Sequence, residues 1–148
     1  MDEKLFKKTF DKVSTDNDFL KFNKYWYQQT SETIVALTLQ KSKFGNYLDL
    51  NIKTFIQGLF NKNHELTNAL FRDTGDVFRR QPIEYNYIFN LDESWEVDIL
   101  EGKLQDFFKK FINSYSENMS SKNAIIQFHE KFPDQVFLLP AVKKELYL

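Results

Sequence analysis

The sequence contains no cysteine among its 148 residues, and this absence removes several kinds of chemistry at once. Without a thiol there is no disulfide framework, no cysteine nucleophile and no thiolate metal site. Histidine is scarce as well, since His64 and His129 each have only an adjacent glutamate beside them. Adjacent side chains on a helix diverge by about 100° and do not converge on one metal ion. The sequence therefore predicts no metal site and no cofactor.

Arginine is also rare, because it occurs only at Arg72, Arg79 and Arg80. The formal net charge is −1, so the basic residues, which are mostly lysines, are balanced by acidic ones. Domains that bind nucleic acid usually carry a basic excess, with arginines that reach base edges. We therefore expect no nucleic-acid partner.

Long apolar runs are missing too. No stretch approaches the roughly 20 apolar residues that a membrane-spanning helix needs. The first residues, Met1 to Lys4, are charged, and the apolar stretch and cleavage site of a secretory signal do not follow them. Together with the lack of cysteine, this pattern predicts a cytoplasmic protein with no membrane partner.

Glycine occurs at only four isolated positions, so a glycine-rich loop of the phosphate-binding kind cannot be built. No serine lies in a Gly-x-Ser-x-Gly sequence. The stretch from Leu91 to Asp98 holds four carboxylates, which suit the entry of a helix better than a catalytic pair. These absences favour a non-enzymatic function without deciding the question.

Aromatic residues, in contrast, make up 17% of the chain. A chain of this length can bury a sizeable core as a single domain over residues 1–148. Two long strands are predicted over 33–40 and 47–56, and the second alternates in polarity, with Asp49, Asn51 and Lys53 predicted to face water. Shorter strands are predicted over 25–29, 76–80 and 84–91, the second of them at an edge of the sheet.

Helical patterns frame these strands. Asp2 can cap a first helix, and Asn63 can cap a short one that continues through Leu70. Apolar residues at helical spacing from Leu100 to Tyr115 predict a long helix, and further helices are expected over 121–132 and after Pro140. We therefore predict an α+β fold, with an antiparallel sheet of about four to five strands packed by an N-terminal helix and C-terminal helices.

Four places in the sequence carry a resemblance to a known family. They are the opening helix with Phe6 and Phe10, the segment Tyr25-Trp26-Tyr27, the stretch Leu39-Gln40-Lys41-Ser42 with Phe44-Gly45 and Tyr47 after it, and the late Phe-rich helices. Over most of its length the chain thereby resembles bacterial domain-of-unknown-function family 4304, and the region from Phe60 to Asn90 departs most from it. The resemblance implies no established activity. An association of such proteins with toxin neutralisation makes an immunity-like role an expectation.

The loop from Gln40 to Asn46 is the first candidate site. Lysines and an exposed aromatic residue on a tight loop can bind an anionic or a protein partner, and Arg79 and Arg80 on a neighbouring strand can join them. The competing explanation is turn chemistry, because Gly45 and Asn46 tolerate a positive φ. The candidate binding residues are Trp26, Gln40, Lys41, Ser42, Lys43, Tyr47, Arg79 and Arg80.

Tyrosine and tryptophan gather in the predicted strands, and both residue types are favoured at protein interfaces. The pattern leaves open whether they face water or a covering helix. Our leading hypothesis is a non-enzymatic module that binds another protein, in an immunity-like role. The alternative is an enzyme or small-anion binder that uses a pocket near the Lys41–Tyr47 loop with Arg79 and Arg80. A homo-oligomer assembled through the sheet is a third hypothesis, and the sequence does not set the oligomeric state.

Overall fold

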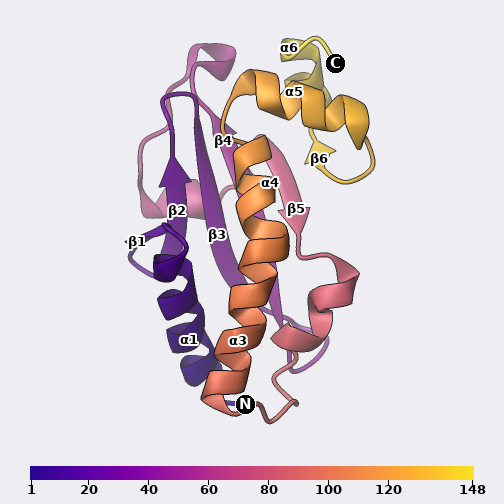
Figure 1. Cartoon of the computed structure of the whole chain (residues 1–148). Coiled ribbons are helices and arrows are strands. Elements are labelled where there is room, and N and C mark those ends of the chain that lie inside the picture. Colours follow the sequence, from indigo (N-terminus) through magenta and orange to yellow (C-terminus); the bar gives the residue numbers. More distant parts are fainter.

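The computed structural model describes all 148 residues and confirms the α+β fold. A single open sheet holds six antiparallel strands in sequence order, against the four to five that were expected (Figure 1). The strands are β1 (Leu20–Phe22), β2 (Tyr25–Gln29), β3 (Thr33–Lys41), β4 (Leu48–Ile56), β5 (Val77–Arg80) and β6 (Phe137–Leu138).

Most of the helices gather on one face and at one end of this sheet. Figure 1 shows α1 and the long α3–α4 helix side by side across the same face, with α5 and α6 at the end where the chain finishes. The helices are α1 (Glu3–Asp16), α2 (Asn68–Arg72), α3 (Val97–Phe107), α4 (Asn113–Asn118), α5 (Lys122–Lys131) and α6 (Pro140–Glu145), with the short helices η1 (Leu59–Asn61), η2 (Ile83–Phe89) and η3 (Phe108–Ile112). None of them is long and apolar enough to cross a bilayer.

The main core lies between the sheet and the α1 and α3 helices. Its centre is a group of aromatic rings, in which Phe10 meets Trp26 at 4.8 Å and Phe108 at 5.6 Å between ring centroids. Phe89 and Phe107 extend the group at 5.6 Å. Such edge and tilted contacts add to the stabilisation that comes from burying apolar area. The phenylalanines at helical spacing are therefore core residues, as their pattern predicts.

The opposite face of the sheet is drier than its polar residues predict. The short helix α2 covers part of it, and Phe71 of this helix stacks on Tyr25 at 4.8 Å. Asn51 and Lys53 are 6% and 7% exposed, so the prediction that they face water is wrong. The Lys53 ammonium donates to the Phe71 carbonyl at 2.6 Å, and burial lowers the pKa of Lys53. The helix α2 therefore turns a predicted wet face into a second, smaller core.

Several predicted helix boundaries are confirmed by their caps. Asp2 accepts a hydrogen bond from the Lys4 N–H, Ser121 caps α5, and Pro140 occupies the first turn of α6. The stripe from Leu100 to Tyr115 lies on one continuous helix, which η3 widens to a π-helical turn.

Other boundaries differ from the prediction. Residues 84–91 are not a strand, because η2 occupies most of this range as a 3₁₀ helix after Pro82. The short helix α2 is capped by Thr67 rather than Asn63. β5 is not an edge strand, since β6 pairs with its outer side.

Candidate functional site

Trp26 does not belong to any exposed site. Its side chain is only 3% exposed, and its ring packs against Phe10 in the main core. The indole N–H donates to the Asp11 carboxylate at 2.8 Å, which satisfies its one donor. Trp26 is thus a core residue with its polar atom paired, and the prediction that it binds a partner is corrected here.

The loop between β3 and β4 uses two of its predicted binding residues to hold its own shape. The Lys41 ammonium donates to the Gly45 carbonyl at 3.0 Å, and the Ser42 hydroxyl accepts from the Phe44 N–H at 3.0 Å. Gly45 does not adopt a positive φ, and neither does Asn46. A Cβ at Gly45 would instead lie 2.8 Å from a ring carbon of Tyr47. The requirements of the turn therefore account for much of this loop, and Gly45 is needed for close packing against Tyr47 rather than for a positive φ.

Lys43 and Phe44 are the parts of the loop that remain available to a partner. Both side chains are exposed, and Phe44 is 93% exposed. A single exposed aromatic ring is common on protein surfaces and does not by itself define a site.

Gln40 and Arg80 meet on the face opposite the main core. The Arg80 Nε–H donates to Asn51 Oδ1 at 3.2 Å, and the Asn51 amide donates to Gln40 Oε1 at 3.0 Å. Strand pairing places Arg80 of β5 directly opposite Asn51 of β4, and Gln40 of β3 lies two residues along from the partner of Asn51. Asn51 was missed because strand alternation assigned it to water, although it is the residue that links the other two.

Arg79 lies on the other face, because neighbouring residues of a strand point to opposite sides. Its guanidinium lies 4.8 Å from the ring centroid of Phe111 and 5.7 Å from that of Tyr115. One Nη1–H donates to Gln135 Oε1 at 3.0 Å. Burial lowers the pKa of Arg79, against the opposing effect of Tyr115 and Glu84. The two arginines therefore do not form one cationic cluster.

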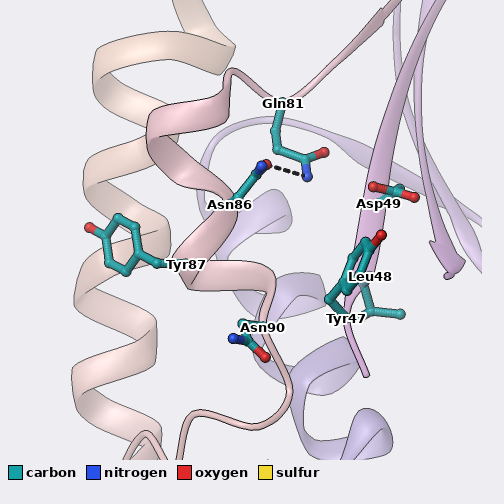
Figure 2. A pocket seen from close by; sticks show the side chains of 7 residues that line it. All are labelled: Tyr47, Leu48, Asp49, Gln81, Asn86, Tyr87 and Asn90. Atoms are coloured by element: carbon teal, nitrogen blue, oxygen red, sulfur yellow. Dashed lines mark hydrogen bonds between the residues drawn. The ribbon is translucent and has the colours of Figure 1, made fainter. Parts of the chain in front are cut away.

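A pocket of about 380 Å³ does lie beside the loop, between β4 and η2. Figure 2 shows Asn86 reaching Gln81, with Asn90 below them and Asp49 and Tyr47 on the strand side. Of the predicted binding residues, only Tyr47 lines it. It has one carboxylate, from Asp49, and no lysine or arginine in its lining, so its charge does not favour an anion.

Gln81 holds this pocket together. Its Oε1 accepts from the buried Leu50 N–H at 2.8 Å, and its Nε2 donates to Asn86 Oδ1 at 3.1 Å. β5 ends at Arg80, so the side chain of the next residue replaces a strand neighbour for Leu50. Nothing in the local sequence separates Gln81 from an ordinary surface glutamine.

Arg79 and Arg80 both line a second hollow. It is an open groove of about 640 Å³ along β5 and β6, lined by Arg79, Arg80, Pro82, Ile83, Glu84, Asp134, Gln135, Val136 and Phe137. Ile83 is 85% exposed and Phe137 is 55% exposed, although both are large and apolar. A smaller cavity of about 190 Å³ lies under α4 and α5, and it shares Arg79 and Gln135 with the groove. Apart from the arginines, none of the groove residues stood out in the sequence.

The side-chain geometry brings together few groups that could bind a metal or act as an acid–base pair. No group of three or more histidine, aspartate or glutamate residues converges as metal ligands do. His64 lies 3.5 Å from the Asp76 carboxylate without a third member. Within the acidic stretch 91–98, the Asp92 carboxylate accepts from the Asn46 amide, so it has a structural role.

The chain matches no protein-family model, no curated protein and no solved structure. The resemblance to family 4304 therefore stays a prediction.

Proposed function

We propose that this protein is a non-enzymatic module that binds a segment of another protein in the groove along β5 and β6. The observation that carries the proposal is the pair Ile83 and Phe137, which expose two large apolar side chains on the same groove. Exposed apolar residues that lie together beside polar ones are typical of protein interaction sites. Arg79 and Arg80 line the same groove and supply hydrogen-bond donors beside these anchors.

The edge of the sheet supports the same proposal. β6 is the last strand of the sheet and is only two residues long. An edge strand presents unpaired backbone groups to which an extended segment of another chain can add; a strand of two residues offers only one or two of them, so side-chain contacts supply most of the affinity. We therefore favour an extended partner segment that lies along β6, with an apolar side chain between Ile83 and Phe137 and an acidic one near the arginines. An immunity-like role, in which the partner is a toxin, is one biological form of this function, and its support is the family resemblance.

Selection from a random-peptide display library tests this function. We expect the wild-type protein to enrich peptides that hold apolar and acidic residues, and the double variant I83E/F137E to lose at least about tenfold in affinity for them. The control variant is L20E, because Leu20 is also apolar, is 60% exposed and lies on β1 at the far edge of the sheet. L20E should bind the selected peptides as the wild type does. Equal binding by all three proteins, or no enrichment at all, would reject the proposal.

The pocket in Figure 2 favours a second function, the binding of a small neutral ligand. Its volume of about 380 Å³ lies within the usual range for ligand pockets, and the amides of Asn86 and Asn90 offer N–H donors, while their oxygens already accept from Gln81 and Asp92. A fragment screen by NMR tests it. Neutral fragments should move the side-chain amide signals of these two residues more than carboxylate fragments do, and the reverse order would count against a neutral ligand.

A further inference from the structure

Arg79 is a partly buried cation that has no carboxylate partner. No aspartate or glutamate oxygen lies within 4.0 Å of its guanidinium, since none of the six ion pairs of the chain includes it. The only hydrogen bond of its side chain goes to the neutral amide of Gln135. A guanidinium has five N–H donors, so most of them remain free.

The surroundings of Arg79 hold its guanidinium in place from one side. The rings of Phe111 and Tyr115 lie 4.8 Å and 5.7 Å from it, and arginine stacks well on aromatic faces. Withdrawing a cation from water without a counter-ion is unfavourable. Burial accordingly lowers the pKa of Arg79. The side chain is thus fixed in an orientation that leaves donors unused.

The cavity of about 190 Å³ beside Arg79 offers further hydrogen-bonding groups. Ser114 and Asn118 line it together with Lys110, whose ammonium is already bound to Asp106 at 2.8 Å. Tyr115 also lines it and is only 3% exposed, and its hydroxyl has no hydrogen-bond partner. An unpaired buried hydroxyl is unusual in a folded protein and is expected to find a partner. Because that oxygen is itself buried, Ser114 and Asn118 are the neutral polar groups that a ligand in the cavity can contact.

We propose that this cavity binds a carboxylate carried on an apolar group, with the Arg79 guanidinium as its main partner. Because Lys110 is neutralised by Asp106, the cavity contributes about one positive charge, which matches a carboxylate better than a phosphate dianion. The planar guanidinium can donate two parallel hydrogen bonds to a carboxylate. Phe111, Phe128 and Phe132 form the apolar part of the wall.

This inference rests on the proposed function for the source of the carboxylate, which would be an acidic residue or chain end of the bound partner. The cavity shares Arg79 and Gln135 with the groove along β5 and β6, so one partner segment can occupy both. A free small carboxylate has the same chemistry and is the other source.

The Nε–H signals of arginine provide a direct test, because the chain has only Arg72, Arg79 and Arg80. Phenylacetate is the probe, and 2-phenylacetamide and inorganic phosphate are its controls. We expect phenylacetate to move the Arg79 signal and to leave that of the exposed Arg72 unchanged. R79Q should weaken binding at least about tenfold, since a hydrogen bond between charged groups is lost, whereas R72Q should leave the affinity within about twofold.

The opposite results overturn the inference. Equal binding of the neutral amide, stronger binding of phosphate, or an Arg79 signal that does not move would each show that the cavity is not a carboxylate site. R79Q is read only together with the wild-type titration, so a variant that folds poorly does not decide the outcome.

The two sources and the two proposals are separated by the library-selected peptides. If an acidic peptide displaces phenylacetate and its amide-substituted form does not, the carboxylate comes from the partner. If phenylacetate binds and no peptide does, the cavity stands as a site for a free carboxylate and the protein-binding function fails. If peptides bind the groove while phenylacetate leaves Arg79 unchanged, the protein-binding function stands and the carboxylate site fails.

Discussion

Replacing Gln81 with methionine tests whether its side chain supplies the hydrogen-bond acceptor that a neighbouring strand would otherwise give to the Leu50 N–H. Gln81 is 8% exposed, and its Oε1 is the acceptor for the buried Leu50 N–H at 2.8 Å. Methionine has almost the same shape but offers no oxygen, so Q81M removes the acceptor without opening a large cavity. The variant therefore isolates the hydrogen bonds from the packing.

The expected loss can be worked out from these contacts. A buried N–H left without an acceptor costs about 1–3 kcal/mol, and losing the bond to Asn86 costs about 1 kcal/mol more. The more apolar methionine side chain offsets roughly 1 kcal/mol. We expect the free energy of unfolding to fall by about 2 kcal/mol, which lowers the Tm by about 4–8 °C in a chain of this size.

Chemical denaturation and hydrogen exchange measure the two parts of this prediction. The free energy of unfolding should drop for Q81M and stay within about 0.5 kcal/mol for Q127M, because Gln127 is exposed and makes no side-chain hydrogen bond. The Leu50 amide should exchange faster relative to the Ile52 amide of the same strand. If Q81M is as stable as Q127M, or if Leu50 gains no exchange relative to Ile52, then Gln81 does not replace a strand neighbour.

Two further predictions concern backbone conformation and pH. Gly75 has a φ of +86°, and a Cβ there would lie 3.2 Å from the Thr54 carbonyl oxygen, so G75A should destabilise the protein by about 1–2 kcal/mol in thermal unfolding. Gly102 in α3 has open space around it, so G102A should stabilise the protein by up to about 1 kcal/mol. Equal effects of the two substitutions would refute the steric argument. Burial raises the pKa of Asp76, against the opposing hydrogen bond from the Ile56 N–H, so the folded state binds this proton more readily than the unfolded chain does. The stability of the wild type relative to D76N should therefore rise as the pH falls from 7 through the raised pKa, and should level off below about 3.9, the ordinary value for aspartate; a difference that is flat or falls over this range would contradict it.

The long elements of the fold were predictable because their patterns have one structural solution. Residues 33–40 are rich in β-branched and apolar residues and residues 48–53 alternate in polarity, and both segments are strands with Leu37 and Ile52 paired in the main core. The caps at Asp2 and Ser121 act through a local hydrogen bond, which depends on no distant residue. The local sequence is thus sufficient to predict an element whose conformation depends only on residues close to it in the chain.

The segment 84–91 shows where the same method fails. It alternates as a strand does, but Tyr85, Ile88 and Phe89 also recur at helical spacing, so two periods coexist. In the structure, Tyr85 packs on Phe107 at 4.7 Å and Phe89 is fully buried, while Tyr87 is 47% exposed. Contacts with a helix that comes later in the chain selected the helical spacing, and no local pattern carries that information.

Exposure of the strand aromatic residues was undecided by the sequence for the same reason. Tyr25 is 8% exposed because Phe71 of α2 stacks on it, and Trp26 is buried because α1 covers the other face. A helix of five residues thereby removes Tyr25 from the surface on which a partner could dock. Ile83 and Phe137, which are among the apolar residues that stay exposed, lie in segments for which the sequence pattern predicts no surface.

Arg79 and Arg80 illustrate how the candidate site changes when strand geometry is applied to it. Side by side in the sequence, they were expected to act together with the loop after Gln40. Alternation sends Arg80 to the face of Asn51, whose amide oxygen accepts from it, and sends Arg79 beside the rings of Phe111 in η3 and Tyr115 in α4. Two adjacent cations therefore differ in their surroundings because strand alternation sends them to opposite faces: Arg80 lies exposed on the sheet surface, and Arg79 is partly buried against aromatic rings.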